Sequence, residues 1–155
     1  MKLTRKQVKT ILSYIDLIEQ NIQSREEILL DIYSENDAYE NIDDYSNPKY
    51  NDDIRSYLEY EYLGFKNEYL ERIILNKFNV KIKILGKEEE LNKCPCCNYR
   101  TLEARGVYDI CKVCKWEDDG SNKIDAFSNV NRKTLREAQL EFEESKFISE
   151  KYIRG

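Results

Sequence analysis

Two short stretches, Cys94-Pro95-Cys96-Cys97 and Cys111-Lys112-Val113-Cys114, decide the fold of the C-terminal part of this 155-residue chain. In each stretch two cysteines are separated by two residues, which is the spacing of a metal-binding knuckle. Only a short loop joins the two pairs, so four thiolates can reach the corners of one tetrahedron. The spacing therefore predicts one structural Zn²⁺ ion, bound by Cys94, Cys97, Cys111 and Cys114.

The residues between the two cysteine pairs are sufficient for a β-hairpin. We expect residues 99–102 and 107–110 to be its strands, which is the layout of a zinc ribbon. Each pair then forms a turn whose backbone N–H groups face the sulfur atoms and stabilise their charge. A thioredoxin-like redox site needs a single cysteine pair at the start of a helix, and two neighbouring pairs do not fit that pattern.

Cys96 is a fifth cysteine that a tetrahedral ion does not require. We expect it to be a small packing residue or an exposed thiol beside the site. The alternative is a reactive thiol, although Arg100 is its only basic neighbour in the sequence.

An acidic run, Trp116-Glu117-Asp118-Asp119-Gly120, follows the second cysteine pair. The single tryptophan is expected to cover the metal as a local core. The three carboxylates could bind a hard cation through oxygen. The interpretation we prefer is an exposed turn that ends at the glycine.

The rest of the chain carries mostly helical patterns. Thr4 with Gln7 predicts a capping box, and Ser24 with Glu27 predicts the start of a second helix. Apolar residues at helical spacing are expected to form core, namely Val8, Ile11, Leu12, Ile15, Ile18 and Ile22.

Further elements follow along the chain. Residues 51–62 and a segment that starts at Asn67 are expected to be helical, and residues 80–84 alternate like a half-buried strand. A capping box at Thr134 and Glu137 opens a final helix, expected to pack back on the ribbon or on the N-terminal helices.

These patterns predict an α+β fold. It consists of an N-terminal helical region with a short β-strand, a zinc-ribbon β-hairpin and a C-terminal helix. We divide the chain into an acidic, mainly helical region, residues 1–90, and a zinc-ribbon-like domain with its helix, residues 91–155.

Composition narrows the possible functions. The formal net charge is −5, and the excess of acid lies in residues 1–90. Such a surface repels nucleic-acid phosphates and attracts basic partners. The chain has no histidine, which removes the usual general base at neutral pH. No apolar run approaches a membrane span and no targeting segment is recognisable, so we expect a cytoplasmic protein with reduced thiols.

Residues 31–62 combine carboxylates with tyrosines. One interpretation is a solvated loop and helix whose tyrosines half-pack on the body of the protein. The other is a face that binds a basic protein, because tyrosine and carboxylate together suit such a partner. The candidate residues of this face are Asp37, Glu40, Asp43, Asp44, Tyr45, Tyr50, Asp52 and Asp53.

The C-terminal motifs resemble those of the bacterial cysteine-rich CPCC family. The resemblance is carried by Cys94-Pro95-Cys96-Cys97-Asn98-Tyr99-Arg100-Thr101-Leu102, by Ile110-Cys111-Lys112-Val113-Cys114-Lys115-Trp116-Glu117-Asp118-Asp119, and by Thr134-Leu135-Arg136-Glu137-Ala138. Asn98 stands where the family has glycine, and Lys112 stands where it has proline. Neither departure removes a ligand. Asn47-Pro48-Lys49-Tyr50 and residues 64–70 are similar to longer members.

Together these features predict a non-catalytic, zinc-stabilised binding protein. The function we favour is a cytoplasmic immunity protein that neutralises a bacterial toxin by covering its active site with the acidic, tyrosine-bearing face. The alternative is a nucleic-acid-binding or regulatory zinc ribbon, for which the basic residues of the C-terminal half would form the contact patch. A zinc enzyme is not expected, because four cysteines leave no coordination position for water.

Overall fold

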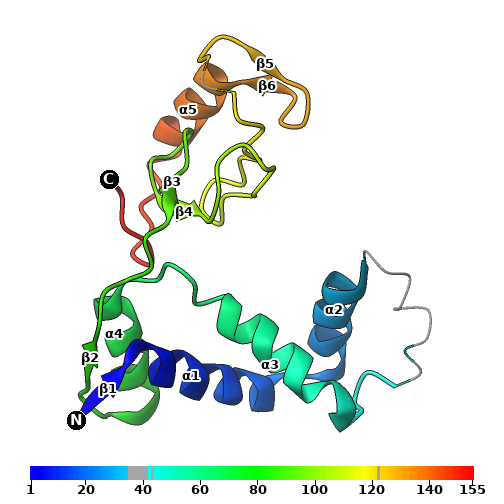
Figure 1. Ribbon diagram of the computed structural model, residues 1–155, viewed down its shortest axis with the longest axis vertical. Helices are drawn as coiled ribbons and strands as arrows, with labels where there is room; N and C mark the ends of the chain where they lie inside the picture. The colour runs from blue at the N-terminus through cyan, green and yellow to red at the C-terminus, as the bar shows by residue number, and fades with distance from the viewer. Residues whose placement is uncertain (35–41, 43, 122) are drawn as a thin grey trace. The chain divides into compact units, whose positions relative to one another are not determined.

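The computed structural model describes residues 1–34, 42, 44–121 and 123–155. The chain forms two compact units that interleave in sequence. Unit 1 consists of Met1–Leu63 and Glu71–Gly86, and unit 2 of Gly64–Leu70 and Lys87–Gly155. The fold is mixed α+β, as the sequence predicts, with helices concentrated in unit 1 and short strands in both units (Figure 1).

Unit 1 begins with a strand that pairs with a distant one. Strand β1 (Lys2–Thr4) runs parallel to β2 (Lys83–Leu85), and Leu3 lies opposite Ile84. Helix α1 (Arg5–Glu19) follows β1 directly, and the predicted Thr4–Gln7 capping box is present. The strand predicted at residues 80–84 is present only from Lys83 and extends to Leu85. Its partner β1 was not predicted, because it is only three residues long.

The core of unit 1 lies between α2 (Ile22–Tyr33) and α3 (Asn51–Tyr60). Its buried centre is Leu29, Ile54 and Leu58, and α3 also packs against α1. The predicted start of α2 was wrong: Asn21, not Ser24, is its N-cap, and its side-chain oxygen accepts from the Ser24 N–H at 2.9 Å. A short 3₁₀ turn, η3 (Pro48–Tyr50), leads into α3.

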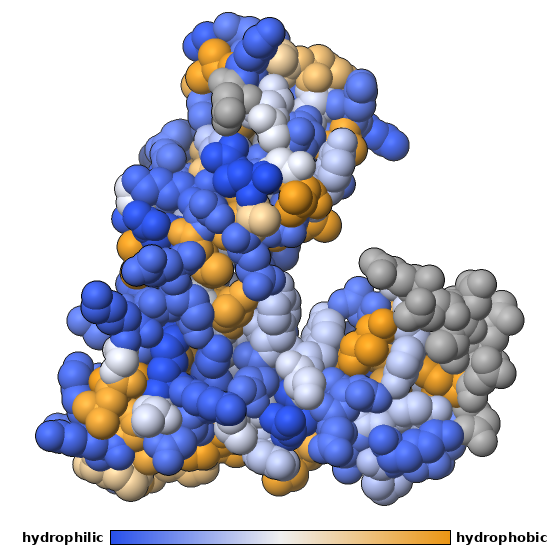
Figure 2. All heavy atoms as spheres, viewed as in Figure 1, coloured by the Kyte–Doolittle hydropathy of each residue, from blue (hydrophilic) through white to orange (hydrophobic). Residues whose placement is uncertain are grey.

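The prediction that one apolar stripe of α1 is core was only half right. Val8 and Leu12 are fully buried, whereas Ile11 is 39% exposed and Ile18 82% exposed. Ile22, just beyond α1, is also exposed. The helix packs on α3 and on the small sheet with one edge of the stripe, because three-residue strands are too short to cover its full width. Orange spheres along the lower edge of Figure 2 mark apolar surface of unit 1.

Helix α4 (Asn67–Phe78) starts in the segment assigned to unit 2 and continues in unit 1. Within unit 1, Glu71 on this helix accepts from the Ile84 N–H at 2.8 Å. This bond satisfies an edge donor of β2 that the two-stranded sheet leaves open.

The described residues of unit 2 contain two pairs of very short strands. Strand β3 (Asn92–Lys93) pairs antiparallel with β4 (Arg100–Leu102), and β5 (Phe127–Ser128) with β6 (Lys133–Thr134). An isolated bridge joins Ile110 and Glu117. The predicted pairing of residues 99–102 with 107–110 was wrong. Each cysteine knuckle reverses the chain by itself, so the residues on either side of a knuckle pair with each other.

The C-terminal helix packs on the ribbon, one of the two expected positions. Helix α5 (Leu135–Glu144) begins at the predicted capping box. Gln139 donates from Nε2 to the Pro95 carbonyl at 2.8 Å, and the Phe142 ring lies edge-on to Tyr99 at 6.4 Å. The tail beyond α5 then runs beside β4, where the Arg100 N–H donates to the Ile153 carbonyl at 2.9 Å.

Residues 64–70 complete unit 2 from far upstream in the chain. Phe65 bridges to Tyr152 and lies edge-on to its ring at 5.2 Å. Gly64 has φ of +76°, and a Cβ there would lie 2.5 Å from Leu91 Cδ1, so only glycine fits without displacement. The acidic connector Glu88-Glu89-Glu90 holds residues 64–70 in place. Glu89 accepts from the Gly64 N–H, and Glu88 accepts from the Asn67 N–H.

Candidate metal centre

The two cysteine pairs form matching turns. In the first, the Asn98 N–H donates to the Cys94 carbonyl at 3.0 Å, and the Cys94 N–H donates to the Tyr99 carbonyl at 2.9 Å. In the second, Lys115 and Cys111 make the equivalent first bond at 2.9 Å, and Cys111 and Trp116 the second at 2.9 Å. Each turn therefore presents its two sulfur atoms in the same geometry.

The four cysteines named from the spacing lie together. The Sγ atoms of Cys94, Cys97, Cys111 and Cys114 are all within 4.8 Å of one another. Two sulfur–sulfur distances, Cys94 to Cys114 and Cys97 to Cys111, are 3.6 Å. A tetrahedral ion with metal–sulfur bonds of about 2.3 Å requires sulfur–sulfur distances of about 3.8 Å. The cluster is thus the right size for one such ion.

The surroundings suit a charged sulfur cluster. Thr101 donates from Oγ1 to Cys111 Sγ at 3.0 Å, and the Val113 N–H donates to the same sulfur at 3.4 Å. Hydrogen bonds from Cys114 first, and also from Thr101, hold the pKa of Cys111 far below its ordinary value. The same thiol contacts, with burial, raise the pKa of the other three. A divalent ion at the centre would stabilise the thiolate form of all four cysteines.

Burial closes the centre on most sides. Cys94, Cys97 and Cys111 are fully buried, and Trp116 is 4% exposed beside them, as its predicted covering role requires. Cys114 alone of the four is only partly buried. Arg154 from the C-terminal tail donates to the Cys97 carbonyl at 3.2 Å. Segments distant in sequence therefore fix the position of the first knuckle.

The prediction that the acidic run is an exposed turn was wrong for Asp118. This side chain is completely buried and accepts from Arg105 Nε at 2.6 Å and from the Gly106 N–H at 2.7 Å. Asp109 next to it accepts from the Ala104 N–H at 3.0 Å. The Asp118 carboxylate thus anchors the loop between the knuckles. Because Arg105 and Gly106 already occupy its oxygen atoms, it is not available to bind a hard metal ion.

Two glycines let this loop approach the acidic run. Gly106 and Gly120 have φ of +73° and +78°, and a Cβ on Gly106 would lie 3.2 Å from Gly120 Cα. Because both positions are left-handed and in backbone contact, larger residues are strained there.

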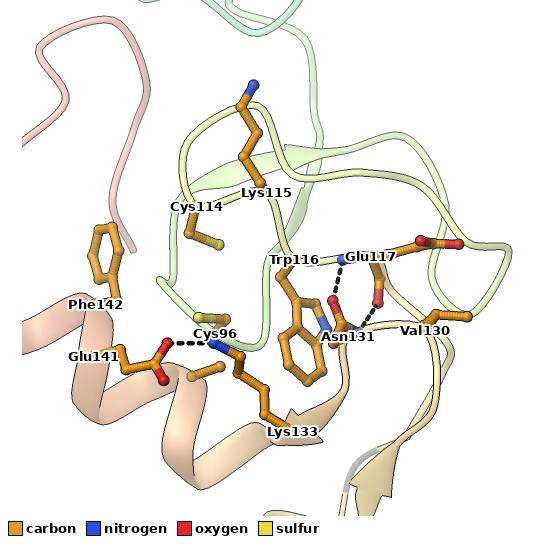
Figure 3. A pocket seen from close by; sticks show the side chains of 11 residues that line it. Cys96, Cys114, Lys115, Trp116, Glu117, Val130, Asn131, Lys133, Glu141 and Phe142 are labelled. Atoms are coloured by element: carbon orange, nitrogen blue, oxygen red, sulfur yellow. Dashed lines mark hydrogen bonds and ion pairs between the residues drawn. The ribbon is translucent and has the colours of Figure 1, made fainter.

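Cys96 lies outside the four-sulfur cluster. It is 6% exposed and borders a pocket of about 350 Å³ next to the centre, together with Cys114 and Trp116 (Figure 3). Lys133 and Glu141 form an ion pair at 2.5 Å on the same pocket. Lys133, the basic residue near Cys96 in the folded chain, belongs to β6. Because it is distant from Cys96 in the sequence, the sequence alone could not identify it as a neighbour.

The acidic face predicted in unit 1 is only partly described. Asp37, Glu40 and Asp43 lie outside the described residues. Tyr45 and Tyr50 are half-buried and pack against the Leu29 core cluster, so their rings serve the fold. The carboxylates differ: Asp44 accepts from the Ser46 hydroxyl at 2.6 Å, Asp53 accepts from the Tyr33 hydroxyl at 2.6 Å, and Asp52 is exposed.

Sequence reasoning missed the residue that organises this region. Arg25 is buried and donates from Nε to the Tyr45 carbonyl at 2.7 Å, from Nη1 to Asn51 Oδ1 at 3.0 Å and from Nη2 to the Asn47 carbonyl at 3.2 Å. An arginine in an amphipathic helix ordinarily points to solvent, so no signal in the sequence marked it.

Fold and site together define a cysteine-rich domain built from two knuckles around one four-thiol cluster. Residues 92–154 match the family described as Cysteine-rich CPCC, which confirms the resemblance noted above for this part of the chain. Comparison with curated proteins and with solved structures found no match. Among the described residues, every helix is too short or too polar to span a membrane.

Proposed function

We propose that this protein is a non-catalytic binding protein whose CPCC domain is held rigid by one structural Zn²⁺ ion. The observation that carries the proposal is the set of four cysteine sulfurs within 4.8 Å of one another, three of them fully buried. Four thiolates complete a tetrahedral zinc site and leave no position at which zinc could activate water. Zinc then stabilises the fold and preorganises whatever surface the domain presents.

The partner we propose is a basic protein, and the role is that of a cytoplasmic immunity protein that covers the active site of a toxin. Support comes from the net charge of −5 and from the exposed carboxylates of Asp44 and Asp52. An acidic surface attracts a basic nuclease site in the way that phosphate does.

A nucleic-acid-binding ribbon is less well supported. Two basic residues of the C-terminal half, which would form its contact patch, are engaged by acids: Lys133 pairs with Glu141, and Arg136 pairs with Asp125 at 2.6 Å. Paired cations release fewer counterions from a nucleic acid, so they contribute less to affinity.

Two measurements test the proposal. Native mass spectrometry of the purified chain should show one zinc ion per chain. A tagged chain, washed at high salt, should retain one basic protein at equal stoichiometry from the native organism. The double variant Asp44→Lys/Asp52→Lys should lose that protein, whereas Glu144→Lys, an exposed site in unit 2, should keep it. Retention of nucleic acid alone would contradict the immunity role.

A further inference from the structure

The pocket beside the metal centre contains two thiols of different kinds. Cys96 is outside the four-sulfur cluster, whereas Cys114 belongs to it. Figure 3 shows both on the wall of the same pocket, whose volume of about 350 Å³ admits a small polar molecule. Cys114 is also the least buried of the four cluster cysteines.

Cys96 and Cys114 come from different knuckles, yet both side chains line this one pocket. The fifth cysteine of the chain therefore lies next to a cluster cysteine, and not in unrelated core.

A second feature of the pocket indicates that it accepts a polar molecule. The Nε1 donor of Trp116 is buried and has no hydrogen-bond acceptor among the described residues. Trp116 borders the pocket, and so does the Lys133–Glu141 ion pair. A buried donor without an acceptor is costly, so a small molecule with oxygen lone pairs is favoured near it.

We propose that Cys96 is a peroxide-reactive thiol that forms a disulfide with Cys114 and so releases the metal ion. This inference rests on the proposed zinc site. Cys96 is the thiol that reacts first, because the metal does not hold its sulfur lone pairs and the pocket gives peroxide access to it.

The chemistry balances with one hydrogen peroxide. The Cys96 sulfur attacks one oxygen of the peroxide: an S–O bond forms and the O–O bond breaks. The leaving hydroxide takes the thiol proton and departs as water, which leaves a sulfenic acid on Cys96. The Cys114 sulfur then attacks the Cys96 sulfur: the S–S bond forms, the S–O bond breaks, and hydroxide leaves and takes a proton from solvent. The metal–sulfur bond of Cys114 breaks in this step. Peroxide is thus reduced to two waters, and the two sulfurs are oxidised to one disulfide.

Loss of Cys114 leaves the ion with three sulfur ligands. Because the remaining ligands bind less tightly than a complete tetrahedral set, the ion dissociates to a competing chelator. A thiol reductant and added zinc should restore the original site.

The test uses the full chain loaded with zinc and treated with hydrogen peroxide. Released zinc is followed by the absorbance of a chelating dye, and disulfides are mapped by mass spectrometry of unreduced peptides. We expect a Cys96–Cys114 peptide to form as zinc is released. Cys96→Ser should keep its zinc before oxidation and release it at least about tenfold more slowly in peroxide.

Three results would decide against the inference or separate it from the zinc proposal. Equal release rates in Cys96→Ser, or mapped disulfides confined to Cys94–Cys97 and Cys111–Cys114, would overturn it. If Cys96→Ser fails to fold, Cys96→Ala and the peptide map of the unaltered chain give the answer. Absence of zinc before oxidation would refute the zinc site, while the peptide map would still test the thiol pair.

Discussion

Asn98 and Lys115 occupy the same place in the two knuckles, and both have left-handed backbones with φ of 63° and 64°. The family has glycine at the position of Asn98, and this conformation explains why, since glycine adopts it without steric cost. Asparagine tolerates it better than other residues, whereas lysine does not.

Replacing Lys115 with glycine should therefore stabilise the protein. We expect Lys115→Gly to raise the free energy of unfolding by about 1 kcal/mol, the relief of left-handed strain less the greater freedom of glycine in the unfolded chain. Denaturant unfolding with saturating zinc measures this. Lys112→Gly, at a position without a positive φ, should destabilise the protein, and a stabilising effect there would contradict the explanation.

Removal of a single cluster cysteine should abolish metal binding. Cys97→Ser and Cys111→Ser each take a fully buried ligand from the cluster, so both should lose zinc and leave unit 2 unfolded. Elemental analysis and circular dichroism check the two effects. Cys96→Ser is the matched control and should retain one zinc ion. Stoichiometric zinc in both ligand variants would disprove the four-thiolate assignment.

Asp118 and Asp119 are adjacent carboxylates with unequal importance. Asp118→Ala removes a buried acceptor of Arg105 and Gly106 and should cost about 3 kcal/mol of stability. Asp119→Ala removes a partly buried acceptor of the Ser121 N–H and should cost less than about 1 kcal/mol. Chemical denaturation of the two variants measures the difference, and equal costs would contradict the assigned roles.

The Arg25 side chain should be essential to unit 1 and irrelevant to the metal. Arg25→Ala removes three hydrogen bonds to residues 45–51 and should cost about 2–3 kcal/mol. Arg25→Lys should recover only part of this, because an ammonium group cannot reach three acceptors in a planar fork. Zinc content should stay at one ion in both variants. Loss of zinc in either would show that Arg25 acts on the metal site.

Lowering the pH should weaken the capping box at the start of α5. The Thr134 N–H donates to the Glu137 carboxylate at 2.7 Å, and this backbone bond, with the Thr134 hydroxyl, holds the pKa of Glu137 below 4.5. Because the folded pKa is depressed, the contribution of the carboxylate is complete above its ordinary pKa. It is lost as the pH falls from about 4.5 through the folded value.

An NMR titration of the Glu137 carboxyl group checks the direction of this shift. Glu137→Gln keeps an acceptor at the same place in the capping box and carries no charge. The helix start in this variant should therefore be insensitive to pH in the same range. A Glu137 pKa above 4.5 would refute the argument.

The cysteine cluster could be predicted from the sequence because a knuckle is a local structure. Its hydrogen bonds join residues four or five positions apart, so the ligand spacing already specifies the turn. The hairpin partners could not be predicted in the same way. The knuckle supplies the chain reversal itself, and nothing in the composition of residues 107–110 reveals that β4 pairs with the residues before Cys94.

Periodicity located the helices but not the depth to which each is buried. Val8 and Ile18 belong to one predicted stripe of α1, yet one is fully buried and the other 82% exposed. The difference depends on the width of the neighbouring elements, which is a tertiary property. The burial of Asp118 and Arg25 escaped prediction for a related reason, since each is stabilised by partners that only the folded chain brings near.

The interleaving of the two units has a consequence for the order of events during protein synthesis. Residues 64–70 leave the ribosome long before Lys151 and Tyr152, which supply the partners of Lys66 and Phe65. Strand β1 likewise has no strand to pair with until β2 has been synthesised, because Lys2 pairs with Lys83. The nascent chain therefore carries an uncovered aromatic segment until Lys151 and Tyr152 have been synthesised, and this interval is when it is most open to chaperones and to misassembly.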